Sequence, residues 1–139
     1  ILNKYISRRS ISEVKTGICL SGGIDSNVIM CILSKTQNPP DRCFTIKSSD
    51  PRYNETSLAI NAASNYGTNH TLIDIHDNEI TPLCNFIKLT KERRSPFLTM
   101  SSFVSTYIAK AAQQENIKVI FGGSGGDEIF SGYYDYFFK

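Results

Sequence analysis

The stretch Thr16–Ser26, TGICLSGGIDS, places a short apolar run directly before a glycine-rich turn, and the turn opens a segment with helical spacing. A strand, a glycine turn and a helix in this order begin a βαβ unit. Backbone amides at the start of a helix, together with the helix dipole, favour an anion. Gly22 and Gly23 let the backbone approach phosphate oxygens closely, because they carry no Cβ atom. The stretch therefore predicts a phosphate-binding turn after the first strand.

Polar side chains of the same turn fit this interpretation. Ser21 and Ser26 offer hydroxyl donors, and Asp25 offers hard oxygen ligands to a Mg²⁺ ion that bridges it to the anion. A structural alternative stays open, in which Asp25 and Ser21 cap a surface helix. The turn matches neither the common P-loop, which ends in GKS or GKT, nor the GxGxxG pattern of dinucleotide sites.

Beyond this turn, short β-type runs alternate with helical spacing along the whole chain. The predicted strands cover residues 16–20, 42–47, 71–75 and 118–121. The predicted helices carry the apolar sets Ile24, Val28, Cys31 and Ile32; Leu58, Ala59, Ala62, Ala63 and Tyr66, with Gly67 as C-cap; Ile80, Leu83, Cys84 and Ile87; Val104, Tyr107, Ile108 and Ala111; and a last segment from about Gly126. Four strands and roughly five helices predict one three-layer α/β domain with a parallel, Rossmann-like sheet, whose ligands lie beyond the strand carboxyl ends.

The composition of the chain narrows the range of possible partners and functions. The 139 residues include 15 Lys and Arg against 13 Asp and Glu, a net charge of +2, which argues against a nucleic-acid or membrane-surface partner and favours a small-molecule site. No apolar run approaches the roughly 18 residues of a spanning helix. The four cysteines lie in apolar runs without zinc spacing, which favours reduced, buried thiols in a cytoplasmic protein. The chain begins at Ile1 rather than Met, so we expect a fragment of a longer protein.

A second glycine turn spans residues 122–128, GGSGGDE, and again follows a strand and opens a helix. Two such turns on one sheet edge can face the same ligand, with Asp127 as a second metal carboxylate. The structural alternative is that the two acidic residues only complement the helix dipole.

The second turn also matches GxSxG, the nucleophile elbow of α/β hydrolases, with Ser124 in the nucleophile position. In that fold the catalytic histidine follows the serine in the chain. Both histidines here, His70 and His76, precede Ser124, so the hydrolase interpretation is disfavoured.

Four segments together resemble the synthetase domain of glutamine-dependent asparagine synthetases and their β-lactam synthetase relatives. They are SGGIDS at 21–26, FTIK at 44–47, YGTNH at 66–70 and GGSGGDEIFSGYYDY at 122–136. The first matches the pyrophosphate loop of the N-type ATP pyrophosphatases. The resemblance covers nearly the whole chain and implies an adenine nucleotide α-hydrolase-like domain over residues 1–139. It further implies a glutaminase domain and late C-terminal helices elsewhere in a longer chain.

The chemistry that this resemblance implies is a two-step amide synthesis. ATP and a carboxylic acid, usually aspartate, give an acyl-adenylate and pyrophosphate, and ammonia then displaces AMP. Ligand contacts carried over by motif are Ser21, Gly22, Gly23, Asp25 and Ser26 for pyrophosphate; Leu20 and Ile46, through backbone, for the nucleoside; Gly122 and Gly123 for ATP; and Asp25 and Asp127 for Mg²⁺.

Candidate catalytic residues by the same resemblance are Ser124, Asp127 and Glu92. Ser124 stands where the family usually has an acidic residue tied to formation of the intermediate. This departure supports a second hypothesis, a degenerate nucleotide-binding or interaction module of the same fold. An ungapped count places Glu92 on a family glutamate that assists amide formation, whereas one gap places Ser95 there, and a solvated surface charge is an equal alternative. Lys139 lies one place from an expected basic residue.

Overall fold

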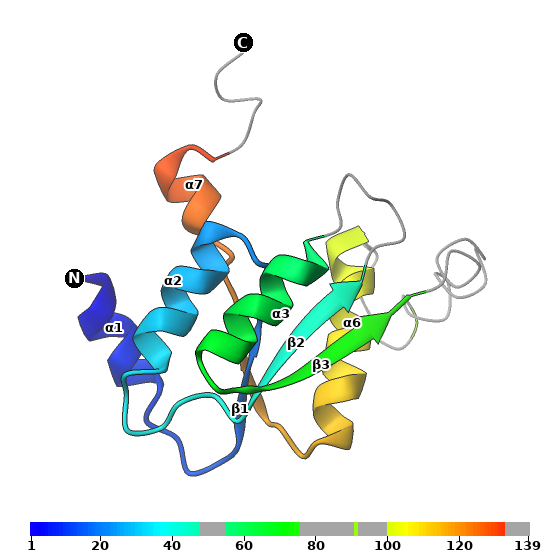
Figure 1. Cartoon of the computed structure of the whole chain (residues 1–139), viewed down its shortest axis with the longest axis horizontal. Coiled ribbons are helices and arrows are strands. Elements are labelled where there is room, and N and C mark those ends of the chain that lie inside the picture. Colours follow the sequence, from blue (N-terminus) through cyan, green and yellow to red (C-terminus); the bar gives the residue numbers. More distant parts are fainter. Residues whose placement is uncertain (48–54, 76–90, 92–99, 133–139) are drawn as a thin grey trace.

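The computed structural model describes residues 1–47, 55–75, 91 and 100–132. Helices α1, α2 and α3 cover one face of a four-stranded sheet, and α6 covers the other (Figure 1). In chain order the elements are α1 (Leu2–Arg9), β1 (Thr16–Cys19), α2 (Ile24–Leu33), β2 (Arg42–Lys47), α3 (Thr56–Asn65), β3 (Asn69–Asp74), α6 (Met100–Gln114), β4 (Val119–Phe121) and α7 (Gly126–Phe130). The predicted three-layer α/β architecture is thus confirmed.

The sheet is parallel throughout and has the order β3-β2-β1-β4. Ile18 of β1 pairs with Phe121 of β4, and Cys19 pairs with Phe44 of β2. All strand carboxyl ends therefore lie at one edge, and the segments after β1 and β4 emerge there side by side. This topology places both glycine turns at the same edge of the sheet, as predicted.

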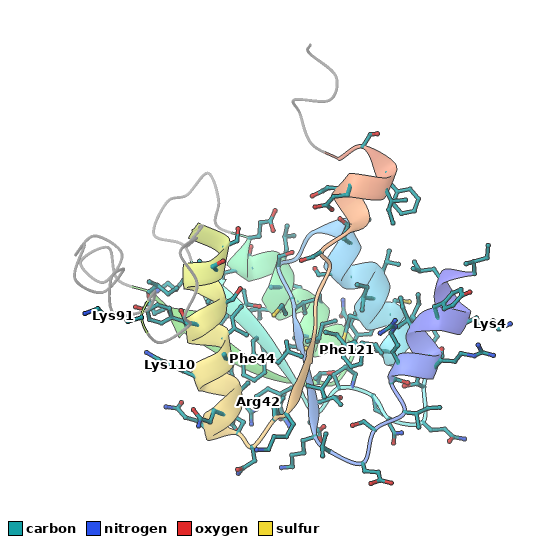
Figure 2. The ribbon with its side chains drawn as sticks, turned by 180° about the vertical axis from the view of Figure 1, so that it is seen from behind. Lys4, Arg42, Phe44, Lys91, Lys110 and Phe121 are labelled. Atoms are coloured by element: carbon teal, nitrogen blue, oxygen red, sulfur yellow. The ribbon has the colours of Figure 1, made fainter. Side chains whose placement is uncertain are left out.

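Two apolar cores lie on the two faces of the sheet. The core beneath α2 and α3 consists of the buried residues Ile18, Leu20, Met30, Leu33, Cys43, Ala59 and Ala63. On the opposite face Phe44 is buried against α6, where it packs with Ala112 and Ile117 (Figure 2). Because side chains alternate along β2, neighbouring residues Cys43 and Phe44 supply one core each.

The buried face of α2 differs from the predicted one. Ile24 is 81% exposed and Val28 is 40% exposed, whereas Ser26, Met30 and Leu33 are buried. Apolar residues occur on nearly every side of this helix, so helical spacing alone could not select the face that packs. The prediction of a helix was right, and the prediction of its face was wrong.

The other predicted elements within the described residues are present with shifted ends, whereas α1 was not predicted. The third strand begins at Asn69 rather than at residue 71, because Asn69 pairs with Arg42. Gly67 follows the C-cap of α3 with a φ of +63°, a left-handed conformation typical of this position. The helix predicted from Ile80 to Ile87 lies outside the described residues.

Three cysteines within the described ranges are free thiols. Cys43 is buried, and desolvation raises its pKa to about 11 despite a hydrogen bond with Thr68 that lowers it. Cys19 and Cys31 are half-buried, and burial also raises the pKa of Cys19. These groups act as small apolar side chains, as predicted, while Cys84 lies outside the described residues.

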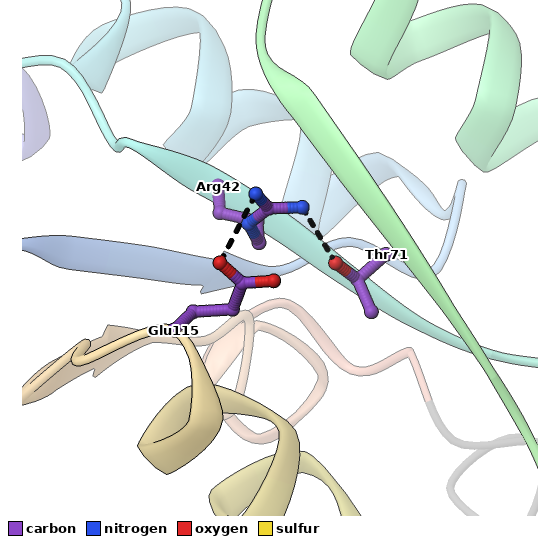
Figure 3. Close-up of polar contacts among 3 residues, drawn as sticks. All are labelled: Arg42, Thr71 and Glu115. Atoms are coloured by element: carbon purple, nitrogen blue, oxygen red, sulfur yellow. Dashed lines mark hydrogen bonds and ion pairs between the residues drawn. The ribbon is translucent and has the colours of Figure 1, made fainter.

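At the amino edge of the sheet, Arg42 at the start of β2 links β3 to the segment after α6. Its guanidinium donates to the Thr71 hydroxyl at 3.0 Å and pairs with the Glu115 carboxylate at 3.2 Å, just beyond α6 (Figure 3). An open hollow of about 430 Å³ lies at the same edge, between residues 12–16 and 37–41, away from both glycine turns. No helix in the described ranges is long and apolar enough to cross a bilayer.

Candidate functional site

The first glycine turn is fixed by backbone conformation and by close packing. Gly22 has a φ of +89°, which L side chains rarely adopt. A Cβ atom on Gly22 would lie 2.8 Å from the Leu58 Cβ and 3.1 Å from the Ala59 amide nitrogen at the start of α3. Glycine is therefore required here both for the turn and for its contact with α3.

Hydrogen bonds between two hydroxyls close the turn internally. The Ser26 hydroxyl donates to the Gly23 carbonyl at 3.1 Å and accepts from the Ser21 amide at 3.3 Å. The two hydroxyl oxygens lie 3.1 Å apart, and the Ser21 hydroxyl accepts from the Gly23 amide at 3.2 Å. The two hydroxyls predicted to reach a ligand thus bond to each other and to the backbone of the turn in this structure.

Backbone amides are the donors that remain at the start of α2. In the described part of the chain, the first α-helical bond of this helix runs from the Asn27 amide to the Gly23 carbonyl at 3.2 Å. The amides of residues 24–26 precede it and have no helical partner, as in any first turn. Such amides, together with the helix dipole, favour an anion, and binding of phosphate at this end stays a prediction.

The second glycine turn contacts the first directly. A Cβ atom on Gly123 would lie 3.1 Å from the Ser26 amide nitrogen and 3.2 Å from the Asp25 Cβ. A Cβ atom on Gly126 would overlap the Asp25 carboxyl group. Figure 1 shows the result, with α7 beside the start of α2. Two glycines of the second turn thus make room for the residues that open the first helix.

Of the two predicted metal ligands, Asp25 lies at the junction of the two turns, and Asp127 lies beyond it. The Asp127 carboxylate packs against Gly132, whose amide donates to the Asp127 carbonyl at 3.0 Å. Among the described residues no group of three or more His, Cys, Asp or Glu side chains could hold a metal. Magnesium is usually held by one or two carboxylates and by substrate phosphates, so the Asp25 carboxylate beside an anion-binding helix end fits that ion.

The two residues predicted to contact a nucleoside through their backbone lie at the carboxyl edge of β1 and β2. Leu20 is 1% exposed, and its amide donates to the Phe44 carbonyl at 2.9 Å. Ile46 lies one residue before the end of β2 and packs on the face covered by α6. The structure therefore brings both residues close to the first glycine turn.

Sequence reasoning missed two polar residues beneath this edge, Thr45 and His70. The Thr45 hydroxyl donates to the Leu20 carbonyl, and the His70 Nε2 lies 2.8 Å from the same hydroxyl. His70 belongs to the YGTNH segment, but its spacing from Thr45 carries no local signal. Only the pairing of β2 with β3 places them together.

Other predicted residues contribute less to this site. Gly122 and Ser124 are exposed on the turn after β4. The sheet order puts His70 of β3 and the turn after β4 at opposite sides of the sheet, so His70 cannot serve Ser124 in a hydrolase arrangement. Glu92, Ser95, His76 and Lys139 lie outside the described residues.

The parallel sheet, with one glycine turn after its inner strand β1 and a second after the neighbouring β4, has the adenine nucleotide α-hydrolase-like fold of the solved structures that it resembles. The chain superposes on an NH3-dependent NAD synthetase from Campylobacter jejuni with a TM-score of 0.58 and 21% identity, over 95% of this chain and 57% of that one. It also matches a U34-tRNA thiolase from Methanococcus maripaludis with a TM-score of 0.60 and 18% identity, over 99% of this chain and 53% of the thiolase chain.

The chain belongs to the asparagine synthase family, whose pattern it matches over residues 1–139. It is 27% identical over 122 residues to asparagine synthetase 1 (glutamine-hydrolysing) of Bacillus subtilis, which covers 88% of this chain and 19% of that protein. The chain spans about a fifth of the length of the curated relatives that it matches.

Proposed function

We propose that this chain is the ATP-binding part of an amide-forming ligase that adenylates a carboxylic acid, releases pyrophosphate and then transfers ammonia to the acyl group. The observation that supports the proposal best is the contact between the two glycine turns, in which Gly123 and Gly126 lie against Ser26 and Asp25. Such an edge presents backbone amides and a carboxylate to one polyphosphate. Membership of the asparagine synthase family supports the same activity.

In this proposal the pyrophosphate binds at the first turn, to Ser21, Gly22, Gly23, Asp25 and Ser26. The amides of residues 24–26 stabilise charge on the leaving pyrophosphate, because the helix holds these donors in place before the pyrophosphate binds. Leu20 and Ile46 hold the nucleoside through their backbone, and Gly122 and Gly123 close the site. Mg²⁺, when bound to Asp25 and Asp127, supplies additional neutralisation of phosphate charge. Asp127 would have to turn from Gly132 toward Asp25 to share that ion.

The acceptor and the nitrogen source extend the proposal beyond the described residues. We infer a small carboxylic acid such as aspartate as acceptor, with Glu92 assisting amide formation. The relatives are glutamine-hydrolysing enzymes about five times as long as this chain, which supports a glutaminase domain elsewhere in the full-length protein. Free thiols at Cys19, Cys31 and Cys43 fit a reducing, cytoplasmic setting.

The experiment that tests the proposal is ATP/pyrophosphate exchange by the full-length protein with Mg²⁺ across a panel of carboxylic acids. We expect exchange with aspartate or a related acid and none without an acid, because adenylation needs an acceptor. Binding of ATP without exchange for any acid would contradict the ligase function.

A degenerate nucleotide-binding module is the second candidate, and Ser124 is the observation that favours it. This exposed serine leaves the second turn one negative charge short of the usual family pattern. Ser124→Glu restores that charge. A large gain of exchange activity in the variant would support the degenerate module, whereas full activity of the unmodified protein would eliminate it.

A further inference from the structure

Both polar groups of a single peptide unit, the one that joins Leu20 to Ser21, are held by side-chain hydroxyls. The Leu20 carbonyl accepts from Thr45 of β2, and the Ser21 amide donates to Ser26 of α2 at 3.3 Å. This peptide is the first unit of the glycine turn after β1. Its plane sets the direction in which the turn leaves the sheet, so its two hydroxyl partners fix the start of the turn.

Thr45 replaces a backbone partner at this point. In the described part of the chain, the parallel ladder between β1 and β2 ends with the bond from the Leu20 amide to the Phe44 carbonyl. The next ladder bond would run from the Ile46 amide to the Leu20 carbonyl, and the Thr45 hydroxyl takes that carbonyl instead. Ile46 stays in register with Ile73 of β3 and lies at the edge where a nucleoside is proposed to bind.

The proton count requires His70 to support Thr45. The threonine hydroxyl has one proton and donates it to Leu20, so the 2.8 Å contact is donated by the His70 Nε2. Thr45 is 4% exposed, and an unsatisfied hydroxyl or carbonyl at such a place is unfavourable. Desolvation lowers the pKa of His70, which favours the neutral ring, and the bond to Thr45 requires that this ring hold its proton on Nε2.

We propose that Thr45 and His70 are positioning residues for nucleotide binding, which hold the Leu20–Ser21 peptide and so align the start of the glycine turn. A chain of hydrogen bonds thus runs from β3 through β2 to the end of β1 and on to α2. The inference rests on the proposed ATP site and adds two residues that do not themselves touch ATP.

Binding of ATP with Mg²⁺ to the full-length protein, measured by calorimetry, tests this role. Thr45→Val keeps the shape of the side chain and removes the hydroxyl, and it should weaken binding about tenfold, since it removes the hydroxyl partner of the buried Leu20 carbonyl and of the half-buried His70 ring. Thr45→Ser retains the hydroxyl and is the matched control, with binding within about twofold of wild type. His70→Phe should resemble Thr45→Val, and His70→Gln, which keeps an N–H donor, should recover part of the affinity.

Unchanged ATP affinity in Thr45→Val and His70→Phe, even with a lower melting temperature, would overturn the proposal, because only a structural role would remain. Where a variant does not fold, nitrogen NMR of the wild-type histidine side chains decides, since the proposal requires a neutral His70 protonated on Nε2. A proton on Nδ1 would overturn it. If wild-type protein fails to bind ATP at all, the proposed function itself is wrong, and this outcome is distinct from an unchanged affinity among the variants.

Discussion

The two glycine turns resemble each other in sequence and differ in how they are held. The first turn packs against α3, is closed by hydroxyls of Ser21 and Ser26, and leads into a ten-residue helix with three buried residues. The second turn leads into α7, five residues long and without a buried residue, in which Ile129 and Phe130 are each 75% exposed. Its described packing against the first turn is through Gly123 and Gly126. The first turn is therefore held by its own contacts with α3 and α2, and the second lies against the first.

The largest expected effect of a single substitution is on stability, at the first turn. Gly22→Ala should lower the free energy of unfolding by about 2–4 kcal/mol, because it adds backbone strain at positive φ to a clash with α3. Gly67→Ala is the matched control. Gly67 also has a positive φ but nothing within 4 Å of an added Cβ, so the loss there should be about 1 kcal/mol. Urea unfolding measures both, and equal losses would contradict the packing of the first turn on α3.

At the second turn the same change should affect binding rather than stability. Gly126→Ala places a methyl group where the Asp25 carboxyl lies, and this short side chain can move aside at little cost to the fold. We expect ATP to bind about 10- to 100-fold more weakly, with a melting temperature close to wild type.

A double-mutant cycle checks the cause of that loss. In an Asp25→Ala background, Gly126→Ala should have little further effect on ATP binding, because the group that it displaces is already gone. Additive losses would show that the second turn acts independently of Asp25, and the proposed dependence of one turn on the other would be wrong.

A smaller effect is expected at the opposite edge of the sheet. Glu115→Ala removes the ion pair between Arg42, whose side chain is 26% exposed, and Glu115, whose side chain is 42% exposed. The change should lower the free energy of unfolding by about 0.5 kcal/mol, because exposed pairs contribute little. The loss should shrink in 1 M salt, because salt screens exposed pairs. ATP affinity should not change, since both turns lie at the other edge. A change in affinity would mean that the turns depend on the whole sheet rather than on their own contacts.

The smallest expected effect is a pH dependence beneath the first turn. Desolvation lowers the pKa of His70 in the folded protein below its unfolded value of about 6.5. Between these two values the unfolded chain binds a proton that the folded chain does not, so the free energy of unfolding falls as the pH decreases. Urea unfolding from pH 7 to pH 5 should show this slope in wild type and a shallower one in His70→Gln. Equal slopes would show that His70 is not desolvated.

Strands, helices and the two turns could be predicted because their signals are local. Glycines between an apolar run and helical spacing indicate a turn wherever they occur, and parallel strands necessarily end at one edge. The buried face of α2 could not be predicted, because Ile24 and Val28 are as apolar as Met30 and Leu33, and only the shape of the neighbouring sheet selects between them.

The contacts of the candidate site divide in the same way. Asp25 and Gly126 could be proposed as neighbours in one site, since each belongs to a glycine turn at the same edge. The bonds that join His70, Thr45 and Leu20 could not, because they depend on the register of three strands. Likewise the bonds that tie the Ser21 and Ser26 hydroxyls to each other and to the turn could not be predicted, because they depend on the folded turn.

The pairing of β1 with β4 also has a consequence for the order in which the chain folds. Thr16 and Val119 are paired although they are about a hundred positions apart, whereas β2 and β3 are contributed by chain much closer to β1. Closing the longest loop carries the largest entropy cost, so we expect β4 to join the sheet late. During synthesis the first glycine turn can form long before the second has left the ribosome. Nucleotide binding would then begin only when β4 is in place, and would report its pairing with β1.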